Sequence, residues 1–274
     1  MRTGQRVSER SHRTGTDHGP VAPWWVSLMV HDLGATQNFY GGLFGWTFEP
    51  GPRQLGPYVR AMLDGNMVAG LGRLPAGLGL QPAWTPYPLS GDADLAAEEI
   101  RFHGGTVAVG PLDTDDAGRL VIASDPTGAV FGVWQPHEGA GDRTPSGPGS
   151  PVWNELTTQA AVAAGTFYAS VFGFEVESEA LPGPDRLTLL LDGRPVAALR
   201  EPGDGDPGRR GSHWRTYFEV EDADEAAARV VELGGQVLRA PEDGPAGRAV
   251  TAADPDGAVF ALAETANGVG GSGL

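Results

Sequence analysis

The chain has 274 residues and a formal charge of −16, because 35 Asp and Glu residues outnumber 19 basic residues, which are all Arg. It contains no Lys and no Cys, which excludes a Schiff-base or phosphate-binding lysine, a cysteine nucleophile, a disulfide, a thiolate zinc site and an iron–sulfur cluster. An acidic chain with scattered arginines has no electrostatic reason to bind nucleic acid, and no apolar run is long enough to span a bilayer. We therefore expect a cytoplasmic protein without nucleic-acid or membrane partners.

Both ends of the chain and one internal stretch have the composition of unstructured segments. Residues 1–20 combine Arg with Ser, Thr and Gly and lack the apolar region of a signal peptide, so they predict a disordered leader. Residues 136–150 are rich in Pro, Gly and Ser and predict a linker. The glycine-rich residues 266–274 predict a flexible tail.

The first structured segment reads as a strand, a helix and three further strands. The apolar run 24–30 predicts a strand, and residues 35–44 predict a helix because apolar side chains recur every four residues on one face. Gly45 ends that helix. Three short strands are then predicted, near Thr47 and over residues 59–63 and 67–71.

The next segment repeats this order of elements. Residues 85–89 predict a strand and residues 93–102 predict a helix, which the glycine pair 104–105 ends. Three more strands are predicted, over residues 106–109, 120–123 and 129–134. Each segment is therefore one βαβββ module.

A shift of about 128 residues lays the second half of the sequence on the first. The helical pair Phe39-Tyr40 meets Phe167-Tyr168, and residues 125–131 (DPTGAVF) meet residues 254–260 (DPDGAVF). We therefore predict two homologous domains, residues 21–135 and 151–265, each with two βαβββ modules.

Together these features resemble the vicinal oxygen chelate superfamily of glyoxalases, bleomycin-resistance proteins and extradiol dioxygenases. The features are a first strand followed by Asp32, the helical Phe-Tyr pair, the Phe-Gly pair that ends each first helix, and the Asp-Pro-x-Gly turn before a final strand. The similarity is greatest to two-repeat actinobacterial members labelled glyoxalase-like. The resemblance implies an α+β fold of four βαβββ modules in two tandem domains, whose curled mixed sheets enclose cavities.

The resemblance also implies a divalent metal in the cavity, bound by His or Gln on two first strands and by Glu on a last strand. Aligned on the repeat, these ligand positions hold Trp25, Thr85 and Gly132 in the first half, and Trp153, Arg215 and Ala261 in the second. Two further last-strand positions fall near Ala69 and Ala197. We therefore expect neither a metal nor another cofactor.

The six histidines test this expectation without the alignment. His12, His18 and His137 lie outside the modules, which leaves His31 at a strand end, His103 at a helix end and His213 before a strand. None of these three has a histidine at the repeat-related position, so we interpret them as surface or capping residues. The competing interpretation is that they converge on a metal with one carboxylate.

Alternation along the strands assigns the side chains that face the cavities, if the ligand positions point inward. In the first half Trp25, Ser27, Tyr87, Leu89 and Trp134 would face inward, and in the second half Trp153 and Arg215. Aromatic walls with a few polar groups are typical of pockets for organic ligands, so all of these except Leu89 are predicted substrate-binding residues. Alternatively, Trp25 and Trp153 merely fill the space of a metal site.

Glu155 and Tyr217 are the candidate catalytic residues. Both are predicted on the inner face of the second half, where Glu155 could act as a general acid or base, a role that its repeat mate Ser27 cannot take. In the competing interpretation, Glu155 and Arg215 form a structural ion pair. Arg215 could instead bind an acidic group of the substrate.

The sequence thus favours a glyoxalase-like protein, monomeric or homodimeric, that binds or sequesters an aromatic metabolite or antibiotic without the family metal. The alternative is a metal-independent enzyme of the lyase, isomerase or hydroxylase type, acting in secondary or aldehyde metabolism with Glu155 as its acid or base.

Overall fold

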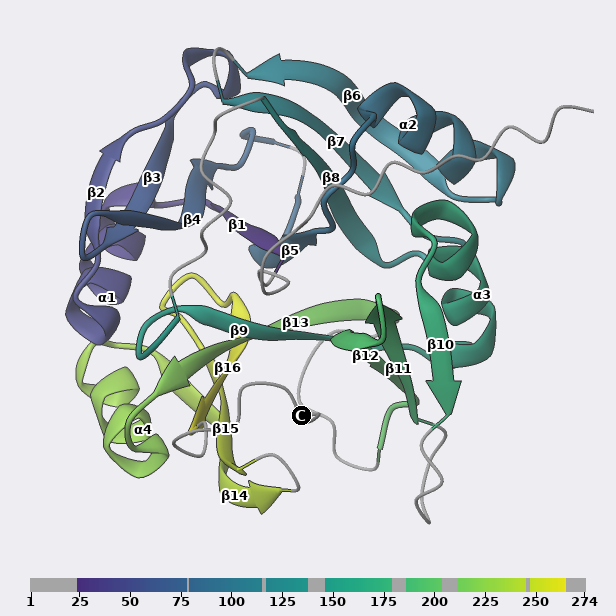
Figure 1. The fold of residues 1–274 in the computed structure, drawn as a ribbon. Helices are drawn as coiled ribbons and strands as arrows, with labels where there is room; N and C mark the ends of the chain where they lie inside the picture. The colour runs from purple at the N-terminus through teal and green to yellow at the C-terminus, as the bar shows by residue number, and fades with distance from the viewer. Residues whose placement is uncertain are drawn as a thin grey trace, which may run out of the picture.

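The computed structural model describes residues 24–77, 79–114, 117–137, 146–178, 186–203, 211–244 and 247–264. The predicted leader and tail, and part of the predicted linker, lie outside these ranges. The order of strand, helix and three strands occurs four times, as predicted (Figure 1). Among the described residues, no helix has the length and apolar character needed to cross a membrane.

The elements of the first half are β1 (Trp25–Val30), α1 (Leu33–Phe44), β2 (Thr47–Pro50), β3 (Tyr58–Leu63), β4 (Asn66–Arg73), β5 (Ala83–Tyr87), α2 (Ala93–Phe102), β6 (Thr106–Thr114), β7 (Gly118–Ser124) and β8 (Val130–Pro136). A short 3₁₀ helix, Arg53–Leu55, precedes β3. The second half comprises β9 (Pro151–Thr157), α3 (Ala161–Phe172), β10 (Glu175–Ser178), β11 (Arg186–Leu191), β12 (Arg194–Arg200), β13 (His213–Val220), α4 (Ala223–Glu232), β14 (Gln236–Gly244), β15 (Gly247–Ala253) and β16 (Val259–Glu264).

Short polar residues and glycines set the helix ends. The side chains of Asp32, Asp92 and Asp222 accept backbone N–H bonds at the start of α1, α2 and α4, where otherwise unpaired donors favour an acidic cap. Gly45 and Gly173 end α1 and α3 with φ of 72° and 74°, a left-handed conformation that glycine adopts without strain.

Each half folds its strands into a curled mixed sheet with the same strand order. The second half forms eight strands in the order β10-β11-β12-β9-β13-β16-β15-β14. The first half follows this order in two pieces, β2-β3-β4-β1-β5 and β6-β7-β8. At the break, Pro88 accepts a hydrogen bond from Trp134 N but has no N–H to donate in return. A bridge between Leu89 and Trp134 joins the two pieces.

The hydrophobic cores lie between the halves. In one core, α1 and the helix side of β1–β4 pack against α4 and the helix side of β13–β16. In the other core, the module of α2 (β5–β8) packs against the module of α3 (β9–β12). Figure 1 shows this arrangement, with α1 beside α4 and α2 beside α3. One face of each helix is therefore buried in these cores, and the concave faces of both sheets point away from them.

A hydrogen-bonded chain of three buried side chains joins the halves within the first of these cores. Tyr40 of α1 donates its hydroxyl proton to Asp254 Oδ2 at 3.2 Å, and Trp84 Nε1 donates to Tyr40 Oη at 2.9 Å. Asp254 Oδ1 also accepts the backbone N–H groups of Asp256 and Ala258, which closes the Asp-Pro-x-Gly turn. A single carboxylate thus holds both the turn and the opposite helix.

The second core contains the equivalent chain. Tyr168 of α3 donates to Asp125 Oδ2 at 3.1 Å, and Trp214 Nε1 donates to Tyr168 Oη at 3.0 Å. Phe131, at the end of the same turn segment, packs edge-on against both Phe167 and Tyr168. The two motifs that carry the family resemblance, the helical Phe-Tyr pair and the Asp-Pro-x-Gly turn, therefore meet across the interface between the halves.

Burial raises the pKa of Asp254 from 3.8 to about 6, although hydrogen bonds from the Ala258 N–H and Tyr40 oppose the shift. The folded state therefore binds this proton more tightly than the unfolded chain does. As the pH rises from below 4 to above 6, the contribution of Asp254 to the free energy of unfolding falls by on the order of 2–3 kcal/mol.

Replacing Asp254 with Asn removes this titration. We expect the free energy of unfolding of Asp254→Asn, relative to the unchanged protein, to rise steadily between pH 4 and pH 6.5, because only the unchanged protein loses stability through this group over that interval. Urea denaturation followed by circular dichroism at several pH values measures the difference, in which the contributions of the other carboxylates cancel. A difference that does not vary with pH would contradict the assignment.

Candidate functional site

The concave face of the first-half sheet encloses a cavity of about 450 Å³, which we call the first-half cavity. Side chains from β1, β3, β5, β6, β7 and β8 contribute to its wall, and residues 212–214 and Val259 of the second half also line it. Its aromatic lining residues are Trp25, Tyr58, Trp84, Tyr87, Trp134 and Trp214.

Of the five residues that the sequence predicted to face this cavity, the structure places four in its wall: Trp25, Ser27, Tyr87 and Trp134. The opposite faces of the same strands belong to the cores, as alternation predicts, so Val26 and Leu28 are fully buried. The prediction for Leu89 was wrong. Leu89 lies beyond the end of β5, is 46% exposed and does not line the cavity.

Glycines on neighbouring strands make room for two tyrosines in this wall. The ring of Tyr87 lies over Gly132, where an added Cβ would be 2.0 Å from Tyr87 Cδ1. The phenol of Tyr58 lies over Gly70, where an added Cβ would be 1.6 Å from its oxygen. Both distances are far below van der Waals contact, so these tyrosines occupy the space that side chains would otherwise fill. The sequence analysis did not identify Tyr58 as a cavity residue. The signal that could have identified it is a large aromatic residue on β3 beside a glycine on β4.

Ser27 and Tyr87 supply paired hydroxyl groups in this apolar cavity, with 2.8 Å between Ser27 Oγ and Tyr87 Oη. Burial raises the pKa of Tyr87 to about 12, and the hydrogen bond with Ser27 opposes the shift. Tyr87 therefore keeps its proton at neutral pH. Together the two hydroxyls can orient a ligand without adding charge.

The second half has a charged group on its concave face, centred on Glu155. The carboxylate is 4% exposed and accepts hydrogen bonds at Oε1 from Arg200 Nε at 2.6 Å and from Tyr217 Oη at 3.1 Å. Its Oε2 lies 3.6 Å from Arg186 Nη2. Burial, and then the Glu155 charge, raise the pKa of Tyr217 to about 12, so the hydroxyl remains a donor. Two arginines and a tyrosine thus converge on one carboxylate.

The register of β9 and β13 brings the predicted second-half residues together. Glu155 lies opposite Arg215, and Trp153 lies opposite Tyr217. One of the two interpretations of the sequence paired Glu155 with Arg215, whereas the structure gives Glu155 ion pairs with Arg200 and Arg186. The partners were missed because β11 and β12 were not aligned with β9.

Adjacent residues near the two further last-strand positions face opposite sides of the sheet. Ala69 and Ala197 are fully buried in the cores on the helix side of their strands. Their neighbours Gly70 and Ala198 occupy the concave side, paired with Ser27 and Glu155. A shift of one residue along a strand moves a side chain to the opposite face of the sheet.

The remaining ligand positions do not fit a divalent metal. In the first half Trp25 and Thr85 line the cavity, and Gly132 lies beneath the ring of Tyr87, where a Glu side chain would displace that ring. In the second half the equivalent residues are Trp153, Arg215 and Ala261, which supply a ring, a cation and a methyl group. Such a set offers no carboxylate or imidazole ligand.

The three module histidines lie at separate places in the structure. His31 Nδ1 is 3.1 Å from Asp256 Oδ1, and His103 Nε2 is 3.3 Å from Glu99 Oε2 at the end of α2. These two match the predicted surface and capping roles. His213 differs from both, because it lines the first-half cavity and is only partly exposed. It begins β13, and its Nδ1 lies 3.0 Å from Gly211 O.

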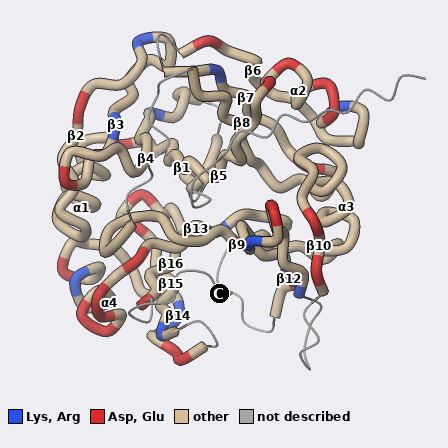
Figure 2. Tube along the Cα trace, viewed as in Figure 1, with Lys and Arg blue, Asp and Glu red and all other residues tan. Residues whose placement is uncertain are grey.

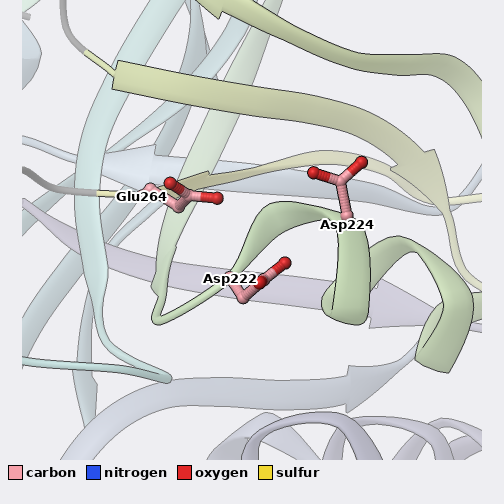
Figure 3. A group of neighbouring side chains, drawn as sticks. All are labelled: Asp222, Asp224 and Glu264. Atoms are coloured by element: carbon pink, nitrogen blue, oxygen red, sulfur yellow. The ribbon is translucent and has the colours of Figure 1, made fainter.

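Within the described residues, three carboxylates lie close enough to hold a cation, Asp222, Asp224 and Glu264 (Figure 3). Each has a structural partner: Asp222 caps α4, Glu264 accepts the N–H of Ala223, and Asp224 pairs with Arg248. The equivalent positions in the first half, Asp92, Gln135 and Asp94, make the same three kinds of contact. The group is therefore the helix-capping arrangement of the module.

The fold and the cavity define a class of protein in which βαβββ modules pair to enclose a small-molecule site. Residues 154–263 match the glyoxalase-like domain family, and residues 24–61 match the bleomycin resistance protein-like N-terminal family. CFP32 of Mycobacterium tuberculosis, which carries the provisional name of a glyoxylase, is 35% identical over 251 residues that cover 89% of this chain and 95% of CFP32. The anthracycline biosynthesis protein DnrV of Streptomyces peucetius is 35% identical over 270 residues that cover 92% and 96%.

Two solved structures show the same fold at 18% identity. One is 2,2',3-trihydroxybiphenyl 1,2-dioxygenase from Sphingomonas wittichii, with a TM-score of 0.61 and coverage of 93% of this chain and 92% of that one. The other is the Mn(II)-bound glyoxalase from Novosphingobium aromaticivorans, with a TM-score of 0.62 and coverage of 89% and 82%. The chain therefore belongs to the vicinal oxygen chelate superfamily, within its glyoxalase-like members.

Glu155→Gln tests the charged group of the second half. We expect this variant to lose about 1–3 kcal/mol in the free energy of unfolding, because it leaves buried guanidinium charge less compensated. Ser27→Ala, at the equivalent first-half position, should lose about 1 kcal/mol or less, since it removes one hydrogen bond between neutral groups. Urea denaturation at pH 7 measures both variants, and a larger loss for Ser27→Ala would contradict the comparison.

Proposed function

We propose that the protein binds a flat polycyclic aromatic molecule in the first-half cavity, without the metal of its family. One observation carries this proposal: the cavity wall combines the indole rings of Trp25 and Trp134 with a tyrosine held flat by Gly132. Flat apolar rings bind aromatic ligands by stacking and edge contacts, and the paired hydroxyls of Ser27 and Tyr87 orient them.

The size of the cavity supports this class of ligand. Its volume of about 450 Å³ lies within the range of roughly 300–1,000 Å³ that is typical of sites for drug-sized molecules. The same wall argues against the competing view that Trp25 simply fills a vacated metal site, because the side chains leave this volume open between them.

The relatives support the same class. The name of DnrV associates that protein with anthracycline biosynthesis, and anthracyclines carry a planar, polycyclic aromatic ring system. Because DnrV matches over 92% of this chain, both halves take part in the similarity. The neutral aglycone of an anthracycline, which lacks the amino sugar and its ammonium group, is therefore the first probe to use.

Titration with this anthracycline aglycone, followed by tryptophan fluorescence, tests this function. We expect saturable quenching with one ligand per chain and a dissociation constant on the order of micromolar or tighter, because Trp25 and Trp134 would contact the bound rings. Gly132→Ala should weaken binding by about tenfold or more, because its methyl group pushes the Tyr87 ring into the cavity.

Ala261→Gly is the matched control, since it changes the equivalent position of the second half and should leave the affinity unchanged. Quenching that does not saturate, or equal affinity in Gly132→Ala and the unchanged protein, would count against the proposal.

The alternative function is a metal-independent enzyme that uses the concave face of the second half. The contact between Tyr217 Oη and Glu155 Oε1 favours it, because it places a neutral donor beside a carboxylate. The short bond from Arg200 to the same oxygen favours the structural role instead, because it occupies the atom that a general base would use.

The two roles of Glu155 are separated by comparing turnover with binding. If the enzyme function holds, Glu155→Gln abolishes conversion of the anthracycline, followed by chromatography, and leaves its binding intact. Equal loss of both, or of neither, would exclude Glu155 as the acid or base. Tyr217→Phe then tests the second candidate catalytic residue, because it removes the neighbouring donor but keeps the carboxylate and its ion pairs.

A further inference from the structure

The charged side chain that lines the first-half cavity among the described residues is basic. Among the described residues, its wall contains Arg60 and, at the rim, His213, but neither Asp nor Glu. The chain as a whole has the opposite balance, with 35 acidic and 19 basic residues. Figure 2 shows acidic residues along α4 and α2, whereas β1 and β5 carry no charged residue. The cavity therefore differs in charge from the chain around it.

Arg60 projects from the middle of β3 onto the concave face. Its neighbour Ala61 is fully buried on the helix side, so alternation places Arg60 on the cavity side with Tyr58. Its partner on β4 is Gly70, which has no side chain to cover the guanidinium. Its partner on β2 is the exposed Glu49, and no carboxylate of the described residues lies within ion-pair distance of Arg60.

The neighbouring tyrosine does not neutralise this charge. Burial raises the pKa of Tyr58 well above its usual value of 10, although the positive charge of Arg60 opposes the shift. Tyr58 is therefore a neutral phenol at physiological pH. The guanidinium keeps a full positive charge, because arginine does not lose its proton in proteins.

The repeat shows that a basic group here is not a requirement of the fold. The second half has Thr188 at the position of Arg60. Its own concave-face arginines, Arg186 and Arg200, form ion pairs with Glu155, whereas the first half has Ser27 in place of that glutamate. The first half thus presents a cation on its concave face where the compensating carboxylate is replaced by a hydroxyl.

A cation in an apolar cavity selects its ligand by charge. Water is largely excluded from such a site, so electrostatic interactions are stronger there than at an exposed surface. A guanidinium binds a carboxylate through two parallel hydrogen bonds and repels an ammonium group. A ligand with an acidic group would supply an anion, which the described residues of the cavity wall do not.

We propose that the first-half cavity selects flat aromatic carboxylic acids, with the carboxylate paired to Arg60 and the rings against Trp25 and Trp134. This inference rests on the proposed function, since it names the class of aromatic ligand that the same cavity binds. It also reverses the expectation from net charge, which would favour cationic aromatic molecules.

Three probes of nearly equal shape test the selection: anthracene-2-carboxylate, 2-(hydroxymethyl)anthracene and 2-(aminomethyl)anthracene. Equilibrium dialysis of the full chain at pH 7.4, read by anthracene fluorescence, gives the three affinities. We expect the carboxylate to bind about tenfold or more tightly than the alcohol, because it gains a charge-assisted pair, and the amine to bind most weakly.

Arg60→Gln keeps a polar side chain but removes the charge. It should lower the affinity for the carboxylate about tenfold or more and leave the affinity for the alcohol within about twofold. Arg73→Gln is the matched control, because Arg73 is an exposed arginine at the end of β4 and does not line the cavity. It should change none of the three affinities.

The outcomes distinguish this inference from the proposed function. If the neutral alcohol does not bind with the stoichiometry of one per chain, the aromatic site itself is wrong. If the alcohol binds but the carboxylate and the amine bind equally, or if Arg60→Gln leaves the preference for the carboxylate intact, the selection by Arg60 is overturned and the aromatic site stands.

Discussion

The structure depends on the bond between a tyrosine of one half and an aspartate of the other. Tyr40 reaches Asp254, and Tyr168 reaches Asp125, so each turn before a final strand is tied to the helix of the opposite half. These bonds lie inside two aromatic cores that contain all four helices. Because these cores lie on the helix side of the sheets, neither concave face has to contribute to the hydrophobic core.

This arrangement explains how one repeated fold can have two different interiors. The registers are the same, with Ser27 opposite Thr85 in the first half and Glu155 opposite Arg215 in the second. The side chains at these equivalent positions differ, so one concave face is aromatic around a cavity and the other is ionic around Glu155. Substitution on a concave face leaves the cores intact, and the two interiors can therefore diverge independently.

Most of the fold could be predicted from the sequence, because strand and helix periodicity, glycine stops and the repeat agree with one another. The cavity-facing side of β1 followed from alternation, which placed Trp25 and Ser27 correctly. The cross-half pairing could not be predicted, because the module pattern is equally compatible with cores inside each domain. Arg60 and Arg200 were missed because their faces depend on the registers of β3 and β12, and short strands without a polar alternation leave such registers undetermined.

The central claim is that the first-half cavity, and not the ionic face of the second half, is the ligand site. A crystal structure of the protein with anthracene-2-carboxylate tests it most directly. The account predicts electron density for the rings between Trp25 and Trp134, with the carboxylate within hydrogen-bonding distance of Arg60. Density beside Glu155 alone, with the first-half cavity occupied only by solvent, would contradict it.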